Sequence, residues 1–240
     1  MASRLARRLK YPIRRIWHFL YPYTGLNGLD KSVIPFLPVG PGFFIEAGAN
    51  DGIKQSNTYY LEKRRGWKGL LVEPIPSLAA KCKKNRRNSI VESFVLVPPH
   101  RSGTSVEVLD LDLMTMVTGS EGSLLNQKEH ADNAERVQGI TGRKVRVQGI
   151  TLSELIDKVG NPEVTFFSLD VEGFEIEVLR GLDLSRHRPI LILIETKEIV
   201  LIQELLGDLY ELVNTFTHHD YLFHLKSHLL AAKANADFPT

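Results

Sequence analysis

The sequence predicts an α/β fold in which helices cover both faces of a mostly parallel sheet. Short apolar runs alternate with helical patterns from Phe43 onward, which is the rhythm of parallel strands joined by crossover helices. The runs are apolar throughout, as in strands that are buried on both faces. With 240 residues, of which 43% are hydrophobic and 24% charged, the chain suits one soluble domain with a full-sized core.

The expected elements follow one another in this order along the chain. We expect strands at residues 43–47, 69–73, 90–97, 164–170 and 189–195, and helices at residues 54–65, 76–86, 151–159, 174–181 and 198–206. The run Thr151-Leu-Ser-Glu154 is a capping box, which marks the start of a helix. The apolar segments 210–213 and 221–225 are expected to pair as an antiparallel hairpin at one edge of the sheet.

Two parts of the chain depart from this alternation. Residues 1–40 combine a basic start with a connection rich in proline and glycine, which leaves residues 41–240 for the folded domain. Within that domain, residues 98–142 contain a strand-like run at 106–109 and a polar stretch before the strand pattern resumes at 143–147. An excursion of this length often builds a lid or a substrate wall, with a mobile surface loop as the alternative.

The N-terminal segment carries an excess of positive charge. No acidic residue precedes Asp30, so its six basic residues give a charge of +6, while the remaining 24 basic and 28 acidic residues leave the body at −4. A helix over residues 4–20 would have one apolar and one basic face, the pattern of a helix on an anionic membrane surface. Pro12 favours a break in such a helix, and packing against the body or disorder are the alternatives. Because no apolar run approaches the roughly 20 residues that span a bilayer, we expect a cytoplasmic protein, peripheral at the inner face of a membrane if the segment docks.

Two other signals are interpreted as structural. Cys82 is the only cysteine, which excludes an internal disulfide and fits a reducing compartment. Since it has no plausible partner base, we interpret it as a cysteine on a helix surface. The basic residues around it are interpreted as a solvated helix end that complements the helix dipole, with contact to an anionic substrate or lipid as the alternative. They are Lys81, Lys83, Lys84, Arg86 and Arg87. No RNA-binding signature accompanies them, so no nucleic-acid partner is expected.

Residues 43–52, Phe-Phe-Ile-Glu-Ala-Gly-Ala-Asn-Asp-Gly, are the most informative stretch. They indicate a buried strand that runs into a glycine turn, with Glu46 near the end of the strand and Gly48 and Gly52 where a side chain would block close approaches. The next apolar run, residues 69–72, ends in Glu73. A carboxylate there can accept hydrogen bonds from both hydroxyls of an adenosine ribose. This order of strand, glycine turn, helix, strand and acid indicates a nucleoside-binding site.

Further acids follow other predicted strands. Parallel strands place their carboxyl ends at one edge of a sheet, where the ligands of open α/β folds bind. The acids expected at this edge are Glu46, Glu73, Asp170, Glu172 and Glu195. Because unpaired acids are costly to bury, their concentration predicts a polar site.

Five segments carry a family resemblance: Phe44–Gly52, Leu71–Pro76, Ser168–Gly181, Ile192–Glu195 and Tyr221–Phe223. Together they resemble the FkbM-like S-adenosylmethionine-dependent methyltransferases, and the Asp-Val-Glu-Gly run that starts at Asp170 is the most specific marker. The resemblance implies a Rossmann-like class I methyltransferase fold, with a mostly parallel seven-stranded sheet and an antiparallel edge strand. It also implies S-adenosyl-L-methionine as the cofactor. Members of the family typically methylate oxygen, so the implied acceptor is a hydroxyl of a small molecule, natural product, glycan or lipid-linked sugar.

The resemblance also implies which residues form the site. Cofactor contacts are implied for Glu46, Gly48, Asn50, Asp51, Gly52, Asn57, Thr58, Glu73 and Pro74. Glu73 would hold the ribose hydroxyls, and Gln55 and Ser56, with Asn57 and Thr58, could donate to the cofactor carboxylate. Asp170 would lie near the transferred methyl group, with Glu172 beside it.

An alcohol acceptor must lose a proton, which calls for a base within hydrogen-bonding reach. Asp170 or Glu172 is the first choice for this catalytic role, and the alternatives are His100, His130, His218 and His219. The residues expected near the acceptor are His100, Ser123, Glu195 and His218. No metal is expected, although Asp170 with Glu195 could hold a magnesium ion.

Two other functions stay open at this point. A nicotinamide-dependent oxidoreductase shares the order of strand, turn and acid, but the tight G-x-G-x-x-G spacing is missing. A binding or scaffold protein could keep the fold without catalysis, although the intact Glu46, Glu73 and Asp170 count against it.

Overall fold

The computed structural model describes residues 22–110, 116–117 and 143–230. Its centre is a seven-stranded sheet in the order β10-β11-β9-β8-β1-β2-β3. The strands are β1 (Phe43–Ala47), β2 (Lys68–Val72), β3 (Ile90–Glu92), β8 (Phe166–Leu169), β9 (Leu191–Glu195), β10 (Tyr210–Thr215) and β11 (Asp220–Leu225). The neighbouring strands β3, β2, β1, β8 and β9 all pair in parallel.

The sheet confirms the predicted fold class. β11 runs antiparallel to both β9 and β10, so the predicted hairpin is present and its antiparallel strand lies one position in from the edge. The chain passes from β1 to β2 on one side, while β8 joins β1 on the other. Strand order therefore reverses between β1 and β8, and this switch point is where open α/β sheets bind ligands.

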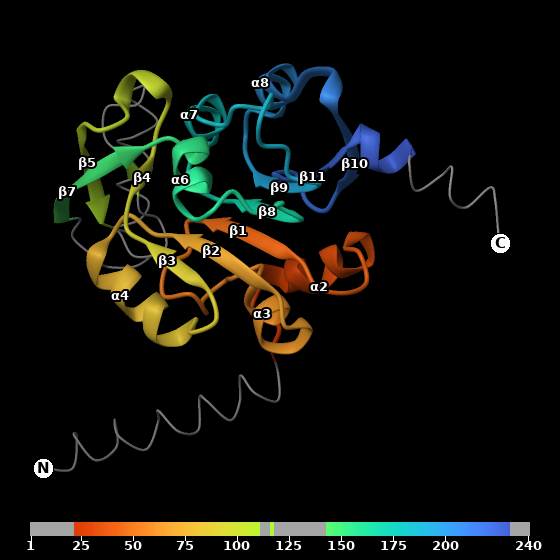
Figure 1. Ribbon diagram of the computed structural model, residues 1–240, viewed down its shortest axis with the longest axis horizontal. Coiled ribbons are helices and arrows are strands. Elements are labelled where there is room, and N and C mark those ends of the chain that lie inside the picture. The colour runs from red at the N-terminus through yellow and green to blue at the C-terminus, as the bar shows by residue number, and fades with distance from the viewer. Residues whose placement is uncertain (1–21, 111–115, 118–142, 231–240) are drawn as a thin grey trace, which may run out of the picture.

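Helices cover both faces of this sheet (Figure 1). On one side lie α6 (Leu152–Lys158), α7 (Glu175–Arg180) and α8 (Ile199–Leu206), and on the other α3 (Tyr59–Arg65) and α4 (Pro76–Asn85). Successive β1 residues serve the two sides: Ile45 packs in the cluster that contains α6, α7 and α8 residues, and Phe44 packs with Leu61 of α3. This is why the strands are apolar throughout. The capping box at Thr151 is confirmed, because Thr151 Oγ1 accepts from the Glu154 N–H.

A second, four-stranded sheet flanks the first. Its order is β4 (Val95–Leu96), β7 (Arg143–Ile150), β5 (Ser105–Asp110) and β6 (Met116–Val117), with the short helix η3 (Pro99–Arg101) between β4 and β5. The prediction of one strand over 90–97 is therefore wrong, because residues 90–92 pair with β2 and residues 95–96 pair with β7. The strand-like runs at 106–109 and 143–147 are confirmed as parts of β5 and β7.

The described part of the N-terminal region folds onto the body. It contains η1 (Leu26–Gly28), α2 (Leu29–Val33) and η2 (Ile34–Phe36), and η5 (Gly207–Leu209) follows α8 much later. Val33 and Leu37 are buried in the same cluster as Leu61. Gly25 forms an isolated bridge with Gln55. The predicted membrane-binding segment, residues 4–20, lies outside the described residues, and no helix within the described ranges has the length and apolarity to cross a bilayer.

The interpretation of α4 as a helix with a solvated basic end is wrong at two positions. Cys82 and Arg86 are both fully buried, whereas their neighbours Lys83 and Arg87 are exposed. Burial raises the pKa of the Cys82 thiol to about 12, so this cysteine stays protonated at neutral pH. Arg86 points into the body, where it meets the turn that follows β1.

Candidate active site

The turn after β1 depends on a glycine that no other residue could replace without movement. Gly48 has a φ of +84°, and a Cβ atom built on it would lie 1.8 Å from the carbonyl oxygen of Asp170. The Gly48 and Ala49 N–H groups both donate to the Val72 carbonyl, each at 3.1 Å. Gly48 thus allows the ends of β1, β2 and β8 to converge.

A cavity opens at this convergence. It holds about 750 Å³ of space when the open solvent at its mouth is included. Its polar lining includes Gly48, Asn50, Glu73, Asp170 and Glu172. Its apolar wall comes partly from the second sheet and consists of Phe94, Val95, Leu96 and Val108, together with Val72, Pro74, Val171, Phe174 and Val178.

Three residues of this lining have unusual backbone angles. Asn50, Gln55 and Glu172 have φ values of 46°, 54° and 54° without being glycines. Such left-handed residues cost about 1–3 kcal/mol each and concentrate at functional sites. Only two other residues of the described ranges share this feature, Asn27 and Asn161. The strain therefore gathers around the cavity.

Glu73 lies in the cavity lining at the tip of β2, where the sequence predicted it. Its side chain is almost fully buried. One carboxylate oxygen accepts from the Asn50 N–H at 2.8 Å, and the other accepts from the Ile75 N–H at 2.9 Å. These two bonds fix the direction of the carboxylate and join the glycine turn to the end of β2.

Glu46 lies behind the glycine turn and is not among the described residues of the cavity lining. Its carboxylate is buried behind the turn, where it accepts from the hydroxyls of Ser56 at 2.8 Å and Thr58 at 2.6 Å, and from the Asn57 N–H at 2.8 Å. Arg86 lies 3.4 Å from the same carboxylate.

Ser56, Asn57 and Thr58 thus face Glu46, and the helix expected from residue 54 begins at Tyr59. None of Glu46, Asp51, Gly52, Asn57 and Thr58 is among the described residues that line the cavity. Their cofactor contacts therefore stay a prediction, and the hydrogen bonds of these residues show that they shape the loop.

Arg86 is the residue that holds this loop, although in the sequence it is only one member of a basic run. Its guanidinium donates to Glu62 at 2.8 Å, Thr58 Oγ1 at 2.8 Å and Ser56 Oγ at 3.0 Å, and to the Gly52 carbonyl at 3.1 Å. The loop between Gly52 and Thr58 contains the cavity residues Lys54 and Gln55. A buried ion-pair network therefore positions one wall of the site.

The acidic residues at the end of β8 form the opposite wall. Asp170 and Glu172 both line the cavity, as expected for the catalytic pair. Burial, followed by repulsion from Glu195 and Glu172, raises the pKa of Asp170 well above its usual value. A raised pKa makes the deprotonated carboxylate a stronger base.

Glu175, for which the sequence predicted no role, supports Glu172. Its carboxylate accepts from the Gly173 N–H at 2.9 Å and from the Val171 N–H at 3.3 Å, and so closes the turn that presents Glu172. Burial raises the pKa of Glu175 to about 7. The backbone donors identify Glu175 as a residue that fixes the turn.

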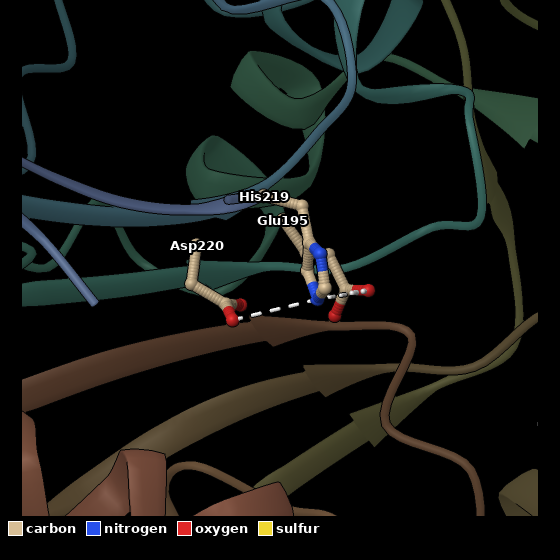
Figure 2. Close-up of side chains that lie close together, drawn as sticks. All are labelled: Glu195, His219 and Asp220. Carbon is tan, nitrogen blue, oxygen red and sulfur yellow. Dashed lines mark ion pairs between the residues drawn. The ribbon is translucent and has the colours of Figure 1, made fainter. Parts of the chain in front are cut away.

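The residues predicted near the acceptor are only partly brought together. Glu195 is the last residue of β9, and His218 lies in the turn before β11, so both lie at the same edge of the sheet as Asp170. Neither is among the described residues of the cavity lining. His219 and Asp220, which follow His218 in the chain, form a cluster with Glu195 (Figure 2). His100 lies exposed on η3, away from the cavity lining, and Ser123 and His130 lie outside the described residues.

Comparison with known families supplies the identification. The model of the methyltransferase FkbM domain matches residues 46–223, more than half of the chain. The chain belongs to the FkbM methyltransferase family. The matched range begins at Glu46 and ends in β11, so it contains the cavity and the acidic edge. No curated protein matches the chain.

Three solved structures are similar to this chain at low sequence identity. TrmN from Thermus thermophilus is 8% identical with a TM-score of 0.42, and the alignment covers 82% of this chain but only 48% of TrmN. A TehB-like SAM-dependent methyltransferase from Corynebacterium glutamicum is 11% identical with a TM-score of 0.42, over 92% of this chain and 99% of that one. Precorrin-6y C5,15-methyltransferase from Geobacter metallireducens is 11% identical with a TM-score of 0.40, over 81% and 84%.

Proposed function

We propose that this FkbM family member transfers a methyl group from S-adenosyl-L-methionine to a hydroxyl oxygen of a sugar, glycan, lipid-linked or natural-product acceptor. The observation that carries the proposal is the placement of Glu73 and Asp170 in one cavity, on either side of Gly48. Family membership supports methyl transfer over hydride transfer to or from a nicotinamide.

The cavity has the chemistry that a sulfonium nucleoside requires. Glu73 is a fixed carboxylate at the tip of β2, where it would accept from the ribose hydroxyls. The apolar side chains of Phe94 and Leu96 would contact the base. Glu172, and Asp170 once it has lost its proton, would provide negative charge that suits a positively charged sulfur. When bound, the cofactor supplies an electrophilic methyl group.

The protein's own contribution to the reaction is positioning and proton transfer. Orientation of the acceptor can remove about 7–11 kcal/mol from a barrier in favourable intramolecular cases. Deprotonated Asp170 would accept the proton of the acceptor hydroxyl as its oxygen attacks, and Glu172 is the second candidate for this base. We expect Asp170→Asn to lower kcat by about 10²–10⁴. Activity of the wild type should rise with pH as Asp170 loses its proton.

Calorimetry on the full chain with S-adenosylmethionine, S-adenosylhomocysteine and NAD tests the proposal. We expect both sulfur nucleotides to bind, and Glu73→Gln to weaken their binding by about 1–3 kcal/mol. Glu163→Gln, at an exposed position, is the matched control and should bind like the wild type. Binding of NAD alone would support the oxidoreductase instead. Binding of the sulfur nucleotides without turnover on any hydroxyl acceptor would favour a scaffold.

A membrane-proximal acceptor is an additional proposal that rests on the basic amphipathic segment at residues 4–20. A docked segment would hold the enzyme at the anionic inner face of a membrane, near lipid-linked sugars.

A further inference from the structure

One group of side chains beside the cavity stays outside the roles assigned so far. Leu169 of β8 pairs with Ile194 of β9, and Glu195 of β9 pairs with Asp220 of β11. Asp170, Glu195 and Asp220 therefore follow one another across the carboxyl edge of the sheet. His219 adds an imidazole to this row. Figure 2 shows its ring between the carboxylates of Glu195 and Asp220.

We propose that Glu195, His219 and Asp220 form a binding site for a divalent transition-metal ion, Mn²⁺ or Zn²⁺. Each residue offers one ligand atom, and these atoms lie within 4.8 Å of one another. Imidazole nitrogen with two carboxylate oxygens is a ligand set that these ions accept, whereas Mg²⁺ prefers oxygen alone.

The distances within the group fit shared coordination better than direct hydrogen bonds. His219 Nε2 lies 3.7 Å from Glu195 Oε1 and 3.6 Å from Asp220 Oδ2. An N–H···O hydrogen bond would measure about 2.7–3.2 Å. Neighbouring ligand atoms on one ion, each about 2.0–2.2 Å from it, lie roughly 3.0–3.5 Å apart. A small inward movement of the side chains would therefore close the site around an ion.

The surrounding structure already orients the imidazole. His219 Nδ1 lies 2.9 Å from Nε2 of His218, so the ring nitrogen that faces away from the carboxylates has a partner. Metal-binding histidines usually hydrogen-bond through their second nitrogen, most often to a carboxylate, a backbone carbonyl or water; here the partner is a second imidazole. The His219 carbonyl accepts from the Thr196 N–H at 2.8 Å, which ties the turn before β11 to the end of β9. The ligands thus stand on backbone segments that are joined to each other.

Charge and exposure agree with an open cation site. The carboxylates of Glu172 and Asp220 each repel the carboxylates of Asp170 and Glu195. A divalent cation would offset this repulsion. The side chains of Glu195 and His219 are 40% and 29% exposed, so water or a substrate oxygen could complete the coordination, as in catalytic metal sites. In the methyl transfer proposed above, on which this role depends, the ion would bind the acceptor hydroxyl and lower its pKa.

Binding of Mn²⁺ to the chelator-treated full chain tests the site without cofactor or acceptor. The electron paramagnetic resonance signal of free Mn²⁺ should fall by one equivalent per chain, and Zn²⁺ should restore it. We expect His219→Ala to weaken binding by at least about tenfold. His228→Ala is the matched control, because His228 is an exposed histidine beyond the other end of β11.

Glu195→Gln is a second ligand variant, which keeps the proposal testable if His219→Ala fails to fold. Circular dichroism reports whether each variant is folded. An undiminished Mn²⁺ signal at millimolar protein would overturn the proposal, and so would wild-type affinity in both folded variants. Because cofactor binding is measured separately, failure of the metal site and failure of the methyltransferase proposal can be told apart.

Discussion

Replacement of Arg86 by methionine would test whether a buried ion-pair network holds the cavity wall. The guanidinium is fully buried, and it donates to Glu62, Ser56 and Thr58 and to the Gly52 carbonyl. Methionine fills a similar length without charge. The substitution would leave the buried carboxylates of Glu62 and Glu46 without this positive partner.

Breaking a buried ion pair by removing one partner costs about 3–5 kcal/mol. We expect the lower end, because Ser89 and Lys63 still donate to Glu62. For a chain of this size, about 3 kcal/mol corresponds to a fall in Tm of roughly 6–12 °C. Burial alone raises the pKa of Glu62, but Arg86, Lys63 and Ser89 outweigh burial and hold this pKa below its usual value. Without Arg86 the folded-state pKa of Glu62 rises, so the loss of stability should be larger at pH 8 than at pH 5.

Guanidinium chloride unfolding of the wild type, Arg86→Met and Arg87→Met would measure the effect. Arg87 is the exposed neighbour, and its replacement should change the free energy of unfolding by less than about 0.5 kcal/mol. Arg86→Lys keeps the charge but not the planar fork, so an intermediate loss is expected. A loss below about 1 kcal/mol for Arg86→Met would refute the reasoning, because the network would then carry no net stability.

Three further predictions concern the turn, a buried acid and the basic segment. Gly48→Ala should lower the free energy of unfolding by about 3 kcal/mol or more, because its Cβ would meet the Asp170 carbonyl. Gly103→Ala is the control: Gly103 also has a positive φ, +75°, but open space around it, so the loss should be only about 1 kcal/mol. Equal losses for the two variants in chemical unfolding would contradict this prediction. Because the pKa of Glu175 is raised to about 7, the wild type should lose stability as pH rises from 4.5 to 7. In Glu175→Gln, this pH-dependent loss should be smaller by up to about 3 kcal/mol. If the stability of wild type and variant changed with pH in the same way, the effect would be excluded. Deletion of residues 1–20 should abolish co-sedimentation with anionic vesicles. Cofactor affinity should stay unchanged, because Thr24 and Gly25 remain and these residues contact Ser56 and Gln55. Unchanged co-sedimentation would reject membrane docking.

The predictions that succeeded depend on local patterns. A strand buried on both faces is apolar whatever its neighbours are, so the runs at residues 43–47 and 69–73 identified β1 and β2. The capping box at Thr151 is likewise closed within four residues. Glu73 and Asp170 were found because an acid directly after a parallel strand must lie at the carboxyl edge.

The predictions that failed concern residues whose environment comes from distant parts of the chain. The helix expected from residue 54 starts late because residues 56–58 bond to Glu46 and Arg86 instead of forming a helical turn. The apolar run at 90–97 gives no sign that its two halves join different sheets. A basic run usually lies in solvent, so only the fold could show that Arg86 is buried.

The order of apolar strands, glycine turn and acids by itself determined the α/β class, the site edge and the two carboxylates at the centre of the proposal. Those features follow from backbone geometry and from the burial of contiguous residues. Only the tertiary structure decided that Glu46 belongs to a buried ion network rather than to the cavity lining, and that His219 stands between Glu195 and Asp220. Each depends on a pair more than twenty residues apart in the chain, Glu46 with Arg86 and Glu195 with His219, and folding alone brings the two members within a few ångströms.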